Sequence, residues 1–196
     1  MPHIPDATDA QLETVKPALD LARAAMGFEP NSLKIMARSP AMLNGFLALS
    51  GAILGPDNTL DPGLRQMMAH ITSAAAGCRY CQAHTAHGAE HRGVDLEKIE
   101  AIWSFETSPL FSDAERAALN FAQAAGRVPN EVTEAHYNAL RAHFSDDDIV
   151  EMVGVISLFG FLNRWNDTLG TALEDSPLAF AEAHLAQTGW TPGHHR

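Results

Sequence analysis

The chain has 196 residues, of which 46% are hydrophobic, so it is long enough to bury a substantial core. Its formal net charge of −11 argues against a sequence-independent nucleic-acid binder, which needs basic stripes, and against docking on anionic lipid. The sequence has neither a run of about 18 apolar residues nor a basic-then-apolar leader, so we expect a cytoplasmic protein without a membrane span.

Alanine is frequent, runs of β-branched residues are rare and apolar residues recur with helical spacing, which together predict an all-α fold in a single domain, residues 1–196. The predicted helices cover residues 8–26, with Pro17 near the start or at a kink, then 33–38, 40–54, 62–76, 78–92, 95–105, 112–125, 131–143, 145–162 and a short stretch within 177–196. The helix that opens at Ser145 is apolar nearly all round, so we expect it to lie in the core.

The only two cysteines of the chain, Cys78 and Cys81, are spaced so that they can form and reopen a disulfide. In a helix over residues 78–92 they lie about 60° apart on one face, with about 4.5 Å of rise between them. Gly77 breaks the preceding helix and places Cys78 at a helix N-terminus, where free N–H groups favour the thiolate. In a reducing compartment such a pair is typical of redox catalysis or a metal site.

Two histidines are candidates for proton transfer beside the thiols. His84 follows Cys81 by three residues and would act as a base or hold a water there. Gln66 and His70 are spaced i, i+4 on the preceding helix and face the thiols if the two helices pack as a hairpin, in which case His70 would accept the thiol proton. For both His84 and His70, the alternative is an ordinary polar helix face or a histidine whose hydrogen bonds serve only the structure.

A zinc site is a second interpretation of the same segment, with Cys78, Cys81, His84 and His87 as ligands. On a continuous helix these residues span about 13.5 Å. A tetrahedral zinc ion needs every ligand atom within about 2.3 Å of the metal, so the helix would have to unwind. A partial site with His70 or a residue from another subunit stays open. Without such a site, we expect His87 to lie at the surface.

Three stretches, Gly77–Thr85, Leu60–Arg65 and Phe159–Asp167, together resemble the alkylhydroperoxidase D-like branch of the carboxymuconolactone decarboxylase superfamily, and more closely its uncharacterised peroxidase-related members. The resemblance covers residues 27–190, so both ends of the chain are extensions of this core. It implies a helical bundle with the CxxC motif at the start of a helix, and a homo-oligomer that is a trimer or a multiple of one.

The resemblance also implies roles for the thiols. Cys81 would attack the peroxide, and Cys78 would resolve the sulfenic acid and meet the dithiol reductant protein. The proton relay of the family uses a glutamate and a histidine at positions that hold Gln66 and Thr85 here. His70 and His84 are the candidate substitutes.

We therefore predict a thiol-dependent peroxidase or disulfide reductase that acts on a hydroperoxide, with no organic cofactor and no metal. Arg164 and Asp167, with the asparagines between and before them, would either approach the thiol pocket or form an internal network. The alternatives are a non-enzymatic redox-responsive assembly module, a metal-binding module, and a cofactor-free lactone decarboxylase, which has no use for a thiol pair.

Overall fold

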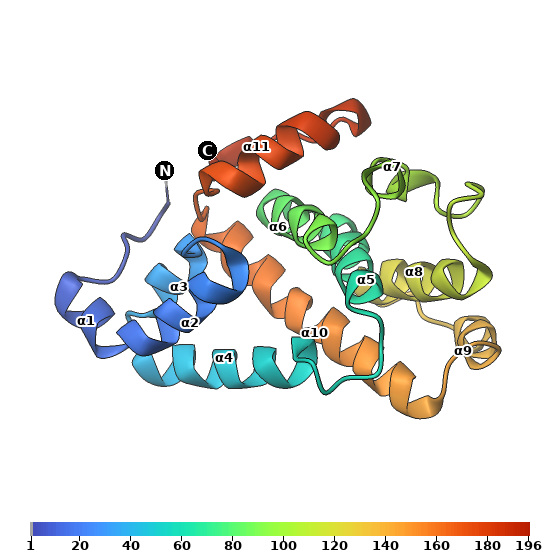
Figure 1. The fold of residues 1–196 in the computed structure, drawn as a ribbon, viewed down its shortest axis with the longest axis horizontal. Helices are drawn as coiled ribbons and strands as arrows, with labels where there is room; N and C mark the ends of the chain where they lie inside the picture. The colour runs from blue at the N-terminus through green and yellow to red at the C-terminus, as the bar shows by residue number, and fades with distance from the viewer. Residues whose placement is uncertain (1) are drawn as a thin grey trace.

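The computed structural model describes residues 2–196, which fold into helices and loops without strands (Figure 1). The helices are α1 (Asp9–Thr14), α2 (Lys16–Met26), α3 (Asn31–Met36), α4 (Pro40–Leu54), α5 (Pro62–Ala75), α6 (Arg79–Glu90), α7 (Leu96–Glu100), α8 (Asp113–Gly126), α9 (Glu134–Arg141), α10 (Asp146–Leu169) and α11 (Asp175–His184). The all-α prediction, with the CxxC motif at the start of a helix, is confirmed. Within this range no helix is both long and apolar enough to cross a bilayer.

The helices α5 and α6 pack together as a hairpin at the centre of the molecule, and α10 crosses both of them (Figure 1). On the outer sides of this hairpin, α8 packs on α5 and α11 packs on α6. The N-terminal helices lie along the side of α10 that α4 contacts (Figure 1). The CxxC segment is therefore enclosed by α5, α10 and α11.

The largest apolar cluster fills the space between α5, α6, α8 and α10. Met68, Leu119 and Met152 are fully buried in it, and burying each such side chain stabilises the fold by roughly 1.5–3 kcal/mol. A second, smaller cluster lies beneath the N-terminal helices and includes Leu33 and Leu43. The core prediction for the helix that follows Ser145 agrees with the burial of its inward face, although Phe161 and Val150 are exposed.

Helix starts follow the local capping signals. The Ser112 side chain accepts from Glu115 N at 3.2 Å, and the Glu115 carboxylate accepts from Ser112 N, as expected for a capping box. At the start of α5, Asp61 accepts from Leu64 N at 2.8 Å, and Pro62 occupies the first helical position. These contacts satisfy backbone N–H groups that have no partner inside the helix.

The expected first helix, residues 8–26, is two helices. Pro17 has no N–H to donate, and in a continuous helix its ring would clash with the carbonyl of Glu13, so α1 ends at Thr14 and α2 begins with Pro17 in its first turn. The helix expected over residues 131–143 is also shorter, because Thr133 caps it and α9 begins only at Glu134.

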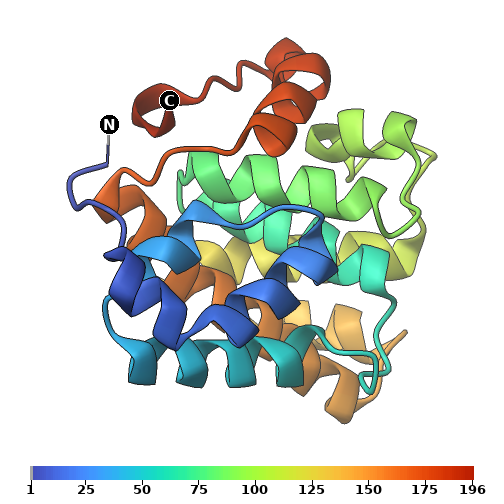
Figure 2. The ribbon, with the colours of Figure 1, turned by 60° about the vertical axis from the view of Figure 1, so that its left-hand side comes forward.

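The two ends of the chain meet near the C-terminal end of α10 (Figures 1 and 2). His3 N donates to Leu169 O at 2.8 Å, and Leu173 N donates to His195 O at 2.7 Å. The C-terminal segment thereby returns across α6, where Trp190 Nε1 donates to Arg79 O at 3.3 Å.

Candidate active site

The two cysteines occupy the first turn of α6. Cys78 is the N-cap residue, and its sulfur accepts a weak hydrogen bond from Cys81 N at 3.5 Å. Both thiols are free, and the pair lies 3.4 Å apart. This separation is longer than a disulfide bond of about 2.05 Å, but small side-chain rotations close it. The local geometry therefore suits reversible disulfide formation.

Both thiols are shielded from solvent, with exposed fractions of 0% for Cys78 and 2% for Cys81. Burial raises the pKa of the Cys81 thiol well above its usual value, and the adjacent Cys78 raises it further. The hydrogen bond from Asn166 Nδ2 to Cys81 Sγ, at 3.5 Å, lowers the pKa in part. Cys81 is thus a neutral thiol near pH 7, and it needs a base when it reacts.

Cys81 lines a pocket of about 590 Å³, and Cys78 does not. The volume lies in the range of small-molecule sites. Most of its wall is apolar and comes from the N-terminal helices and α10, with Leu33, Phe46, Leu47, Leu54, Phe159 and Leu162 among its residues. A few polar groups interrupt this wall, among them His84, Gln66 and Asn166.

His84 is held in place by a carboxylate from the other end of the chain. Its Nε2 lies 2.6 Å from Glu174 Oε2, and its ring stacks on Tyr80 with centroids 4.3 Å apart. Tyr80 Oη also donates to Glu174, at 2.8 Å, and Asn31 N donates to the same carboxylate. Burial alone would raise the pKa of Glu174, but these hydrogen bonds outweigh it and lower the pKa, so the carboxylate is ionised.

An ionised Glu174 fixes the tautomer of His84. Because the carboxylate only accepts hydrogen bonds, Nε2 of His84 carries the proton and Nδ1 is the basic nitrogen. A buried carboxylate in this position also stabilises the imidazolium that forms when Nδ1 takes a proton. The His84–Glu174 pair can therefore work as a base in the pocket that Cys81 lines.

Gln66 lies in the pocket wall against α6. A Cβ on Gly88 would come within 2.9 Å of Gln66 Oε1, so the glycine allows the amide to approach the helix backbone. A neutral amide cannot take a proton, and Gln66 contributes polarity without acid–base function.

His70 reaches α6, where its hydrogen bonds go to Gln82 and Thr85 and not to either thiol. Its Nδ1 lies 3.0 Å from Gln82 O and 3.2 Å from Thr85 Oγ1, and its ring lies beside Trp103. Burial lowers the pKa of His70 to about 4, so the ring is neutral at pH 7. Its contacts favour a structural role over that of the base suggested by helical spacing.

Thr85 also makes its hydrogen bonds within the bundle. Its hydroxyl donates to Cys81 O at 2.7 Å, while its side chain borders the pocket. The expectation that His87 lies at the surface is wrong, because its exposed fraction is 9% and its Nε2 lies 3.0 Å from Ser176 Oγ. The C-terminal helix α11, which packs over α6, covers this side chain.

The expected network between Arg164 and Asp167 does not form. Arg164 lies on the outer face of α10 and donates to Gly160 O at 2.9 Å, whereas Asp167 faces His194 and His195. Residues three apart on a helix can meet, but here these local partners compete. Of this stretch, Asn166 is the residue that bonds a thiol.

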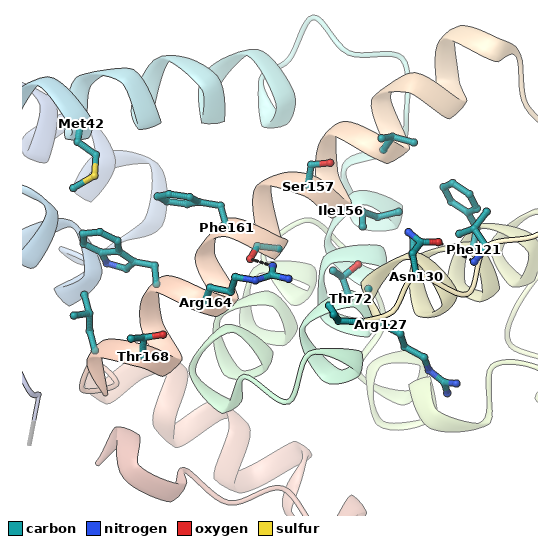
Figure 3. A pocket seen from close by; sticks show the side chains of 18 of the residues that line it. Met42, Thr72, Phe121, Arg127, Asn130, Ile156, Ser157, Phe161, Arg164 and Thr168 are labelled. Atoms are coloured by element: carbon teal, nitrogen blue, oxygen red, sulfur yellow. Dashed lines mark hydrogen bonds between the residues drawn. The ribbon is translucent and has the colours of Figure 1, made fainter.

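Arg164 borders a second and larger cavity of about 990 Å³, which contains no cysteine (Figure 3). Figure 3 shows its hydrogen bond to the α10 backbone, with Phe161 and Thr168 on the same helix. The cavity lies between α10 and the loop after α8, on the side of α10 away from the thiols. Size alone does not make it the candidate active site, because Cys81 lines the smaller pocket.

Sequence reasoning missed Glu174 and assigned Asn166 no separate role. Glu174 precedes α11, where an acidic residue reads as an ordinary helix-start signal. Nothing local in the sequence indicates that it meets a side chain 90 residues away. The interruption of an apolar helix by Asn166 was the available signal for the second residue.

Comparison with known proteins places these features in a family context. The sequence model of the Carboxymuconolactone decarboxylase family matches residues 40–124, which include the α5–α6 hairpin and both cysteines. The uncharacterised protein YnjA of Escherichia coli (strain K12) is 32% identical over 110 residues, which are 56% of this chain and 60% of YnjA. The chain therefore matches less than two thirds of the length of YnjA.

Solved structures extend the likeness to nearly the whole chain. The debrominase Bmp8 is 30% identical with a TM-score of 0.83, covering 90% of this chain and 95% of Bmp8. A cysteine-to-alanine variant of Bmp8 in complex with 2,3,4-tribromopyrrole is 28% identical with a TM-score of 0.86, covering 93% of this chain and 99% of that chain. An uncharacterised peroxidase-related protein from Ralstonia eutropha JMP134, described as an alkylhydroperoxidase AhpD core, is 26% identical with a TM-score of 0.81. The match covers 92% of this chain and 95% of that chain.

Proposed function

The chain belongs to the carboxymuconolactone decarboxylase family, and we propose that it is a thiol-dependent peroxidase that reduces an organic hydroperoxide with the Cys78–Cys81 pair. One observation carries the proposal: Cys81 opens into a largely apolar pocket that it shares with His84, and His84 is oriented by Glu174. A cofactor-free decarboxylase would not need this thiol pair.

The reaction takes place in three steps. The Cys81 thiolate attacks the distal oxygen of the hydroperoxide; the O–O bond breaks, an alcohol leaves and Cys81 becomes a sulfenic acid. The Cys78 thiol then displaces water and forms the Cys78–Cys81 disulfide. A dithiol reductant protein restores both thiols and is itself oxidised to a disulfide.

The His84–Glu174 pair supplies the proton traffic. His84 Nδ1 takes the Cys81 proton, directly or through one water, and returns it to the departing alkoxide. Asn166 steadies the forming thiolate through its bond to Cys81 Sγ. Its Oδ1 has no hydrogen-bond partner among residues 2–196, which leaves an acceptor for the O–H of a hydroperoxide.

The wall of the pocket favours an organic substrate over hydrogen peroxide. Its apolar side chains stabilise a bound hydrocarbon group by removing it from water. Hydrogen peroxide has no such group and gains no binding energy from them. We therefore expect a bulky organic hydroperoxide to react faster than hydrogen peroxide.

Reductive debromination is a second candidate, because debrominase Bmp8 resembles nearly the whole chain. The thiol pair would supply both electrons: the C–Br bond of an aryl bromide is replaced by C–H, bromide leaves and the Cys78–Cys81 disulfide forms. The same apolar pocket would hold the aromatic ring.

We further propose that the protein works in the cytoplasm as a homo-oligomer, a trimer or a multiple of one. Exposed apolar side chains along the larger cavity support this, including Phe161 with an exposed fraction of 42% and Val128 with 79%. Light scattering of the purified protein gives the number of subunits directly.

The test of the reaction is intact-mass analysis after rapid mixing of the reduced protein with one equivalent of cumene hydroperoxide. We expect the wild type to lose two hydrogen atoms within seconds, Cys78→Ser to gain one oxygen atom and Cys81→Ser to stay unchanged. Oxidation no faster than that of a free thiol would overturn the peroxidase proposal. Release of bromide from 2,3,4-tribromopyrrole in a parallel reaction would then favour the second candidate.

A further inference from the structure

Asp167, His194 and His195 form a compact cluster at the C-terminal end of α10. Nε2 of His194 lies 3.4 Å from Asp167 Oδ1, and Nε2 of His195 lies 3.5 Å from the same oxygen. All three atoms lie within 4.8 Å of one another. Neither cysteine belongs to this cluster.

These distances match those between neighbouring ligands of a tetrahedral metal ion. Zinc binds histidine nitrogen and carboxylate oxygen at about 2.0–2.2 Å, so two ligands on adjacent corners are separated by roughly 3.3–3.5 Å. The separations from Asp167 Oδ1 to both histidines fall at this spacing. They are long for direct hydrogen bonds, and Nε2 of His194 lies 3.2 Å from the backbone O of Asp167, a contact that it would give up on binding a metal ion.

The setting of His195 is that of a metal ligand. The residue has an exposed fraction of 0%, and its Nδ1 donates to Thr171 O at 2.8 Å. A backbone carbonyl on one ring nitrogen is the usual outer contact of a ligating histidine, because it leaves the lone pair on the other nitrogen. Across residues 2–196, Nε2 of His195 has no hydrogen-bond partner, although a buried polar atom normally has one.

A charged pair between His195 and Asp167 explains the cluster less well. Because Nδ1 of His195 already donates to Thr171 O, a ring that carries one proton has none on Nε2 to give to Asp167. Two lone pairs therefore face each other across 3.5 Å, and a cation between them would satisfy both.

The N-terminal segment offers a fourth ligand. His3 Nε2 lies 3.6 Å, and His194 Cδ2 3.5 Å, from the point where a Cβ on Gly170 would sit. The two rings thus meet over the same glycine, next to Asp167. His3 is therefore a candidate for the fourth position of the cluster, which otherwise a water would fill.

We propose that Asp167, His194 and His195 bind one divalent cation of the zinc type, with His3 or a water in the fourth position. The ion would join the C-terminal segment to the last turn of α10, and the N-terminal segment as well where His3 is the fourth ligand. His195 also lies beside Tyr80, with ring centroids 5.9 Å apart, and Tyr80 bonds Glu174. The ion would therefore hold the C-terminal segment in place over the His84–Glu174 pair, without touching the substrate.

The test is titration of the metal-free, reduced protein with Co²⁺ alone, followed by displacement with Zn²⁺. Tetrahedral Co²⁺ absorbs strongly in the visible region, and cobalt–thiolate ligation adds a near-ultraviolet charge-transfer band. We expect one equivalent to bind with the visible band and without the thiolate band, in the wild type and in the Cys78→Ser/Cys81→Ser protein alike.

Two substitutions at exposed ligands keep the test independent of folding. Asp167→Asn and His194→Gln should each weaken binding at least about tenfold, the loss typical even of an outer-contact change. His143→Gln, which removes an exposed histidine outside the cluster, should bind as the wild type does. The proposal is overturned by the absence of saturable binding, by unchanged affinity in both ligand variants, or by binding that disappears with the cysteines.

Discussion

His84 and Glu174 are 90 residues apart in the chain, yet Nε2 of His84 lies 2.6 Å from Oε2 of Glu174 at the edge of the thiol pocket. Their contact depends on α11 packing against α6, which places the residue before α11 beside the middle of α6. It provides this chain with a carboxylate–imidazole pair although the family's glutamate and histidine positions hold Gln66 and Thr85.

Glu174→Gln should slow the oxidation of Cys81 by cumene hydroperoxide at pH 7 by about 10- to 100-fold. The amide keeps the shape of the side chain but no longer stabilises the imidazolium of His84. Stopped-flow measurement of tryptophan fluorescence or thiol loss gives the rate.

Tyr80→Phe is the matched control for Glu174→Gln. It removes one hydrogen bond to the carboxylate but leaves the His84–Glu174 pair and the ring that stacks on His84. We expect a rate within about threefold of the wild type, since His84 Nε2 and Asn31 N still bond the carboxylate and keep it ionised. Equal slowing in both variants would assign Glu174 a purely structural role.

Asn166→Ala should raise the pKa of the Cys81 thiol. The change removes the one hydrogen bond that favours the thiolate, while burial and Cys78, which both raise the pKa, remain. A lost bond to a charged sulfur costs about 1.5–3 kcal/mol, so alkylation by iodoacetamide at pH 8 should be about tenfold slower or more. Asn138→Ala, an exposed change on α9, should leave the alkylation rate unaltered.

Gln66→Glu should increase the rate of oxidation by cumene hydroperoxide about tenfold or more. The new carboxyl lies in the wall of the Cys81 pocket, where burial raises its pKa toward neutrality and makes it an effective base. Rapid-mixing kinetics of the single variant measures the gain. A rate equal to that of the wild type would mean that proton transfer does not limit the reaction.

His70→Phe should reduce the loss of stability in acid. The pKa of His70 is about 4 in the folded protein and 6.5 in the unfolded chain. The contribution of neutral His70 to the free energy of unfolding is fully present above pH 6.5. It is lost as the pH falls through 6.5 toward 4, by about 3 kcal/mol in total. Urea unfolding at pH 7 and pH 4.5 should show a smaller difference for the variant than for the wild type.

The same variant separates two roles for His70. The carbonyl of Gln82 loses the hydrogen bond from His70 but keeps the one from Thr85 Oγ1, so stability at pH 7 should fall by about 0.5–1.5 kcal/mol. The pH profile of thiol oxidation should stay that of the wild type, because His70 bonds α6 and not a cysteine. A changed profile would restore His70 as the base.

Helix starts with strong local signals could be predicted from the sequence. Ser112 and Asp61 cap their helices through side-chain contacts three residues long, which short-range chemistry determines. The break at Val15 was harder to predict from the sequence, because a proline can begin a helix or kink one. Which of the two occurs depends on packing against the rest of the chain.

The site could be predicted only as far as a single helix carries it. Cys78 and Cys81 meet because of spacing within one turn, so helical geometry anticipates them. His70 has the spacing to face the same helix, yet the Gln82 carbonyl takes its hydrogen bond first. Glu174 enters through tertiary packing, which no local pattern encodes.

The complete burial of Cys78 sets a condition on the proposed reduction of the disulfide. We expect a protein thiol to reach this sulfur only after a local opening, for which the C-terminal segment that bonds Arg79 O through Trp190 is the candidate. Regeneration would then proceed at the pace of that opening, and raising the reductant concentration would stop accelerating turnover. The two thiols would then reduce a first hydroperoxide rapidly, whereas the rate of this opening would limit re-reduction of the disulfide.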